Sequence, residues 1–147
     1  MSEHPDTLKS RHNLASDLCA QGKFLEAEAE FRTVLDIRER VLGPYDPDTL
    51  DSRNSLAKAL IAQAKYAEAE GQYWAVLNAR EHGLGPDHAD TLMSLYNLAV
   101  CLIRQGRLGD AKEFAWRAMV GRRKVLGPAH PETMNSEQLY NWLSAKI

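Results

Sequence analysis

Three histidines each lie close to a carboxylate in the sequence, and such a combination can bind zinc. They are His4, His88 and His130, and imidazole nitrogen with carboxylate oxygen is a common ligand set. Their spacing, in multiples of 42 residues, places them on separate structural repeats about 10 Å apart, whereas the ligands of one zinc ion lie about 2 Å from it. The sequence therefore predicts no metal site, and His88 and His130 are predicted to cap helices.

The two cysteines, Cys19 and Cys101, are the next candidates for chemistry. A nucleophilic cysteine needs a positioned base and an oxyanion site, and the sequence fixes no base beside either thiol. Two cysteines form no disulfide framework, which suits a reducing compartment. Glycine-rich phosphate loops and paired zinc motifs are also absent from the sequence. Both cysteines are therefore predicted to be small buried or half-buried residues, and no catalytic residue or cofactor is expected.

The densest basic stretch contains Arg117, Arg122, Arg123 and Lys124. A solvated helix face is its ordinary interpretation, and contact with an acidic partner is the alternative. The net charge of the whole chain is -2, whereas proteins that bind nucleic acid usually carry a basic excess. The sequence therefore predicts no nucleic-acid partner.

The chain of 147 residues has the composition of a globular domain, with 44% apolar and 26% charged residues. No apolar run reaches the roughly 18 residues that a membrane span requires. The first six residues are polar and lack the apolar stretch of a signal peptide. These features predict a soluble cytoplasmic protein without a membrane partner.

A repeat of 42 residues organises the chain. Residues 4–45 and 46–87 are identical at 22 of 42 aligned positions, which chance does not produce. The motif Pro-Asp-Thr-Leu at residues 5–8 returns, complete or with one or two changes, at the same step. Its later copies occupy residues 47–50, 89–92 and 131–134. Such a period indicates a stack of repeated structural units.

Each unit is predicted to form two helices. In the second unit, Asp46 can accept a free backbone N–H at the helix start, and Pro47 fits the first helical position. Residues 63–65 form the predicted turn, and a second helix is expected over 66–84. Gly85 then ends that helix. The predicted organisation is one continuous domain with repeats 4–45, 46–87 and 88–129 and a capping helix at 130–147.

The motifs of the first unit resemble the 42-residue tetratricopeptide repeats of kinesin light chains. They are Asn-Leu-Ala at 13–15, Gly-Lys-Phe at 22–24, Glu-Ala-Glu at 26–28 and Leu-Gly-Pro at 42–44. The resemblance implies an all-α fold, a right-handed superhelix of stacked antiparallel helix pairs. The sequence departs from the pattern at Ser55, Ala64 and Ala89.

The resemblance also implies that the first helix of each pair lines a concave peptide-binding groove. Combined with helical spacing, it gives the following candidate groove residues: Lys9, His12, Asn13, Ser16, Asp51, Asn54, Lys58, Met93, Tyr96, Asn97, Val100, Arg104 and Trp142. In the alternative interpretation, Val100, Ile103 and Trp142 simply pack between helices. Kinesin light chains bind extended peptides that carry tryptophan beside acidic residues, and Lys9, Lys58 and Arg104 would contact the acidic part.

Two functions follow from these patterns. The first is a non-catalytic scaffold that binds a protein or an extended peptide through the groove. The alternative is self-association as a homodimer through the end helix 131–147, which no second helix would cover. Its apolar residues are Leu139, Tyr140, Trp142, Leu143 and Ile147. The helix either caps the array or belongs to a longer array, and the sequence leaves both interpretations open.

Overall fold

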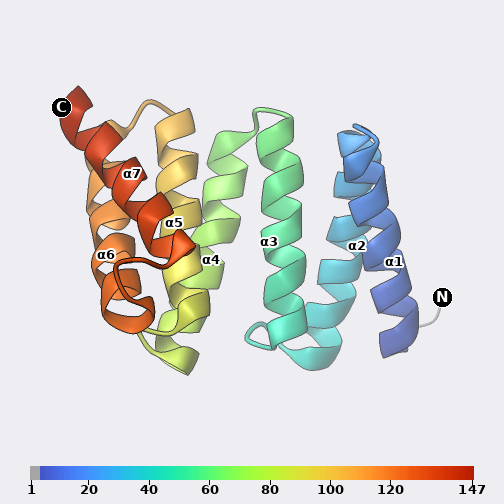
Figure 1. Cartoon of the computed structure of the whole chain (residues 1–147). Helices are drawn as coiled ribbons and strands as arrows, with labels where there is room; N and C mark the ends of the chain where they lie inside the picture. The colour runs from blue at the N-terminus through green and yellow to red at the C-terminus, as the bar shows by residue number, and fades with distance from the viewer. Residues whose placement is uncertain (1–3) are drawn as a thin grey trace. The chain divides into compact units, whose positions relative to one another are not determined.

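The computed structural model describes residues 4–147, and these residues form seven α-helices without a strand (Figure 1). The helices are α1 (Pro5–Ala20), α2 (Phe24–Leu42), α3 (Pro47–Ala62), α4 (Tyr66–Leu84), α5 (Ala89–Arg104), α6 (Leu108–Leu126) and α7 (Pro131–Lys146). Short turns join successive helices into antiparallel pairs. The predicted all-α fold of helix pairs is confirmed.

The described residues gather into two compact units, residues 4–72 and residues 73–147, and the division falls inside α4. In unit 1, α2 packs against both α1 and α3. In unit 2, α6 packs against both α5 and α7. The three repeat boundaries and the capping role of the last helix stay predictions.

The turn between α3 and α4 is strained because alanine occupies a position that favours glycine. Gly22 and Gly106 hold the equivalent turns with φ of 79° and 75°, which glycine adopts without steric cost. Ala64 occupies the same position with φ of 61°. A left-handed conformation costs a residue with a Cβ atom about 1–2 kcal/mol, so tight packing of the flanking helices must offset it.

Small residues and leucines alternate through the core. Ala15, Ala57 and Ala99 are buried at the same position of three first helices, which allows close approach of the paired second helices. In unit 2, α5 and α6 approach so closely that a Cβ atom on Gly121 would collide with the Leu92 side chain. These contacts are the packing that the periodic apolar residues predicted.

A buried arginine joins each second helix to the first helix that follows it. Nη1 of Arg38, Arg80 and Arg122 donates to a serine Oγ 14 residues further on, over 2.9, 2.9 and 2.8 Å. The same Nη1 atoms donate to backbone carbonyl oxygens over 3.2, 3.1 and 3.2 Å. The three serines are Ser52, Ser94 and Ser136, and the carbonyls belong to Asp48, Asp90 and Glu132. We call each set an arginine clip.

The arginine clip corrects one prediction from the sequence. Arg122 is only 2% exposed, so it does not belong to the solvated helix face that the basic stretch suggested. Burial of a guanidinium group is tolerated here because the serine hydroxyl and the carbonyl accept its hydrogen bonds.

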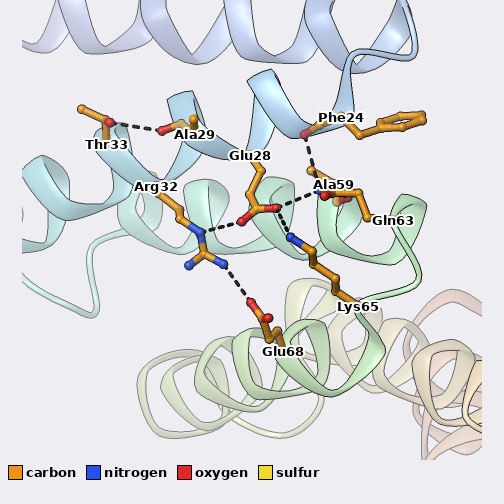
Figure 2. Close-up of polar contacts among 9 residues, drawn as sticks. All are labelled: Phe24, Glu28, Ala29, Arg32, Thr33, Ala59, Gln63, Lys65 and Glu68. Carbon is orange, nitrogen blue, oxygen red and sulfur yellow. Dashed lines mark hydrogen bonds and ion pairs between the residues drawn. The ribbon is translucent and has the colours of Figure 1, made fainter.

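Unit 1 also contains a buried carboxylate with three hydrogen-bond donors (Figure 2). Glu28 on α2 accepts hydrogen bonds from Arg32 over 2.9 Å, Gln63 over 2.8 Å and Lys65 over 3.0 Å. Arg32 donates in turn to Glu68 on α4 over 2.9 Å. Burial alone would raise the pKa of Glu28, but the three donors outweigh it and lower the pKa from 4.5 to about 2.

Leucines at one repeat position provide a test of the core. Leu56 and Leu98 are fully buried, whereas the equivalent Leu14 is 52% exposed. Leu56→Ala or Leu98→Ala should lower the free energy of unfolding by about 2–5 kcal/mol, because each leaves a cavity between helices. Leu14→Ala should cost about 1 kcal/mol or less. Urea unfolding measures all three, and equal losses would contradict the packing described here.

The Glu28 network predicts a dependence of stability on pH. Because the folded-state pKa lies below the unfolded value, Glu28 stabilises the fold above about pH 4.5 and loses this effect as the pH falls through 2. Glu28→Gln should therefore lower the free energy of unfolding at pH 7 by about 1–2 kcal/mol, a value reduced for the solvent exposure of the donors.

The difference between Glu28→Gln and the native chain should shrink when urea unfolding is repeated at successively lower pH. Glu26→Gln, at an exposed position of the same helix, is the matched control and should change little at either pH. A difference for Glu28→Gln that stays constant down to pH 2 would contradict the proposed ionisation.

Candidate functional site

The candidate residues of unit 1 form a polar surface on α1 and α3. Lys9, Asn13 and Ser16 are exposed on α1, and Asp51 and Lys58 are exposed on α3. His12 and Asn54 are half-buried. We call these seven residues the unit 1 face.

His12 ties the two first helices of unit 1 together. Its Nε2 lies 3.4 Å from Ser55 Oγ on α3, and its ring lies edge-on to Phe31, with 5.2 Å between ring centroids. Burial lowers the pKa of His12, and the nearby Arg38 lowers it further, while Asp51 and Asp48 act in the opposite direction. The imidazole is therefore neutral at pH 7, and it contributes an uncharged polar edge to the unit 1 face.

The candidate residues of unit 2 present apolar side chains beside an arginine clip. The Arg122 guanidinium lies 5.0 Å from the centroid of the half-buried Tyr96 ring. Arg122 Nη2 also lies 3.6 Å from the Sδ atom of Met93, which is exposed. One buried cation therefore holds both side chains in place, through a cation–π contact and a weak hydrogen bond to sulfur.

The other candidate residues of unit 2 lie on α5 and α7. Asn97 and Val100 are half-buried, and Arg104 is exposed. Trp142 on α7 is 45% exposed, with Lys146 Nζ 5.5 Å from its ring centroid. So large an exposed fraction shows that Trp142 is not simply packed between helices. We call Met93, Tyr96, Asn97, Val100, Arg104 and Trp142 the unit 2 face.

The sequence analysis did not predict that Arg122 is buried and contacts Tyr96. A signal for it was present, because an arginine recurs at step 42 with a serine 14 residues after each copy. A solvated arginine on a helix has the same appearance in one sequence, so only the structure shows the buried guanidinium and the ring that it contacts.

The remaining basic residues of that stretch pair with acids of unit 2. Arg117 lies 3.0 Å from Glu81, Lys124 lies 2.9 Å from Asp87, and Arg123 pairs with Glu137. These internal ion pairs involve all three charges, and contact with an acidic partner at this stretch stays an alternative from the sequence.

His88 and His130 cap helices, as the sequence predicted, and His4 does the same. The Nδ1 atoms of His4, His88 and His130 each accept a backbone N–H two residues further on, over 3.1 Å. Asp46 Oδ1 accepts the equivalent N–H of Asp48 over 2.9 Å. Across residues 4–147, no three His, Cys, Asp or Glu side chains gather as a metal site would require.

The cysteines also occupy the predicted environments. Cys101 is buried and Cys19 is half-buried, where burial raises the pKa of its thiol. A raised pKa disfavours the thiolate that a nucleophile requires. None of the helices in the described range is long and apolar enough to cross a membrane.

The apolar surplus predicted on the end helix is smaller than expected. Leu143 is completely buried, and Leu139 and Tyr140 are half-buried. The expectation of an uncovered Leu143 was therefore wrong, because α7 turns this side chain inward and packs against α6. Trp142 and Ile147 are the exposed members of the predicted set.

The sequence matches models of the tetratricopeptide repeat over residues 6–82 and residues 91–132. Comparison with curated proteins gave no match. Among solved structures, a single-residue variant of the nearly identical TPR-like repeats assigned to a kinesin light chain of Podosopora anserina is 28% identical, with a TM-score of 0.88. That alignment covers 99% of this chain and 68% of the other.

Two more distant structures show the same fold. BtubC (BKLC) of P. vanneervenii is 18% identical with a TM-score of 0.86, over 94% of this chain and 55% of the other. The type III secretion chaperone SycD of Yersinia enterocolitica, in complex with a peptide of the translocator YopD, is 18% identical with a TM-score of 0.71. Its alignment covers 97% of this chain and 96% of the other.

The capping histidines give a prediction for stability. His88→Ala should lower the free energy of unfolding by about 0.5–2 kcal/mol, because the N–H of Asp90 loses its acceptor. His88→Asp places in α5 the residue type that caps α3 at Asp46, and it should preserve stability. Thermal unfolding distinguishes the variants, and equal losses for both would argue against a capping role.

Proposed function

Since the chain belongs to the tetratricopeptide-repeat family, with repeats of the kinesin light chain type, we propose that it is a non-catalytic scaffold that binds a protein or an extended peptide. The unit 1 face and the unit 2 face, both formed by first helices, are the proposed contact surfaces. Structures of this fold include one with a bound peptide, that of SycD with a peptide of YopD, which supports the general function. A cytoplasmic location stays a prediction from the sequence.

The observation that carries the proposal is the set of apolar side chains on the unit 2 face. Tyr96 and Met93 are accessible to solvent although Arg122 fixes their positions, and Trp142 is largely exposed. Exposed aromatic residues that are already ordered lose little conformational entropy on binding and make strong anchors. This face therefore supplies affinity for apolar side chains of a partner.

The unit 1 face makes a different contribution. Lys9 and Lys58 carry exposed charges, and His12 and Asn54 supply uncharged polar groups. The exposed lysines attract acidic residues and set the direction of a bound chain, but they add little affinity.

Self-association through α7 is the second candidate function. The exposed Trp142 and Ile147 favour it. The burial of Leu143 removes apolar surface that a dimer would otherwise cover, so we rank this function below peptide binding. Sedimentation velocity of the native chain and of Trp142→Ala at several concentrations distinguishes the two functions.

The binding proposal predicts unequal roles for the two faces. A partner captured with the native chain should bind Tyr96→Ala about 1–3 kcal/mol more weakly, chiefly through faster dissociation, because the aromatic anchor is lost. Lys58→Ala should cost about 1 kcal/mol or less, and this loss should shrink at high salt. Isothermal titration calorimetry and stopped-flow kinetics measure both effects.

Tyr96→Phe is the matched control, because it keeps the ring over Arg122 and removes only the hydroxyl group. It should bind the partner as the native chain does, and circular dichroism should show all variants folded. A partner whose affinity is the same for Tyr96→Ala and the native chain would rule out the unit 2 face as its binding surface.

A further inference from the structure

The Arg122 guanidinium group has one edge that the arginine clip does not use. The clip involves only Nη1, which donates to Ser136 Oγ and to the Glu132 carbonyl oxygen. On the opposite edge, Nε has no hydrogen-bond partner within the described residues, and Nη2 lies 3.6 Å from Met93 Sδ. A thioether sulfur is a weak acceptor, so this edge of a buried cation has no strong acceptor within the described residues.

Another arginine of this chain shows what the same edge binds when an acceptor is present. Arg11 donates from Nε and Nη2 to the two carboxylate oxygens of Glu30, over 3.1 and 3.4 Å. A partner's carboxylate would have to displace Met93 to bind the Arg122 edge in this way, because Arg122 is only 2% exposed. The side chain already placed to supply an acceptor is therefore Met93 itself.

Oxidation of Met93 would create such an acceptor. Met93 is 37% exposed, so a peroxide can reach its side chain from solvent. The Sδ lone pair attacks one oxygen of hydrogen peroxide, and the S–O bond forms as the O–O bond breaks. Sulfur loses two electrons, and the departing hydroxide takes the proton of the transferred oxygen and leaves as water. The product is methionine sulfoxide, whose oxygen extends from Sδ towards hydrogen-bond range of Nη2.

The repeat accepts a polar group at this position. Lys9, Asp51 and Asn135 occupy it in the other copies, at steps of 42 residues. We propose that Met93 is a modification site for peroxides, at which the sulfoxide oxygen accepts a hydrogen bond from Arg122 and joins α5 more firmly to α6. Because Met93 belongs to the unit 2 face, oxidation would also replace an apolar group of that face by a polar one. This second consequence rests on the proposed function, whereas the modification site does not.

Glutamine gives a genetic test, because its side-chain amide oxygen is an acceptor at about the place of the sulfoxide oxygen. Met93→Leu is the matched comparison, since leucine is apolar, similar in size and without an acceptor. Met93→Gln should melt about 3 °C above Met93→Leu, as one hydrogen bond from a charged donor allows. The same two substitutions at the exposed Met134 on α7 control for helix propensity, and there Met134→Gln should not melt above Met134→Leu.

Nuclear magnetic resonance follows the oxidation itself. In the intact chain, with methionine isotopically labelled at the methyl carbon, the Met93 signal is assigned through Met93→Leu. Hydrogen peroxide should convert Met93 to its sulfoxide while the buried Met119 stays reduced. The Arg122 Nε–H signal, assigned through its absence in Arg122→Lys, should shift as Met93 is oxidised. Oxidation of Met134 in the Met93→Leu chain is the matched control and should shift the Arg122 signal far less.

Any of three results would overturn the proposal. They are a melting temperature of Met93→Gln no higher than that of Met93→Leu, an Arg122 signal that oxidation of Met93 leaves in place, and oxidation of Met119 before Met93. None of these measurements involves a partner, so the proposal can fail while the proposed function stands. Conversely, a partner that Tyr96→Ala binds with native affinity would count against the proposed function of the unit 2 face and leave the modification site unaffected.

Discussion

The arginine clip is the interaction on which the first-helix surfaces depend. A guanidinium group buried without acceptors would cost several kcal/mol, so the clip forms only when the next first helix brings its serine and carbonyl to the same point. The requirement recurs at Arg38, Arg80 and Arg122, always with a serine 14 residues further on. It therefore sets the register between each second helix and the first helix that follows.

The clip also connects stability with the proposed binding surface. The Arg122 group that donates to Ser136 lies under Tyr96 and beside Met93. At the equivalent position in unit 1, Arg38 lies close enough to His12 to lower the pKa of the imidazole. The same structural cation thus meets an aromatic ring in one unit and a titratable ring in the other. Substitution at a single repeat position changes the chemistry of a face while the helix packing stays constant.

Much of this architecture could be predicted from the sequence. The 42-residue step predicted the helix pairs, and Asp46 and His88 marked helix starts because their short polar side chains accept backbone N–H groups. Burial of individual side chains was harder to predict. Periodicity shows which residues share one face of a helix, but it does not show which other helix packs against that face. Arg122 and Leu143 were both assigned to exposed surface for this reason. The contact of Tyr96 with Arg122 joins two helices, so no local sequence pattern predicts it.

Hydrogen–deuterium exchange of α7 tests the role of the arginine clip most directly. Arg122 and Arg123 are neighbours on α6 that both bind α7, the first buried at Ser136 and the second exposed at Glu137. Arg122→Leu should lower the protection of α7 amides about tenfold or more, because Ser136 Oγ and the Glu132 carbonyl lose a buried partner. Arg123→Leu should change it far less. Equal protection of α7 in both variants would contradict the central place given to the clip.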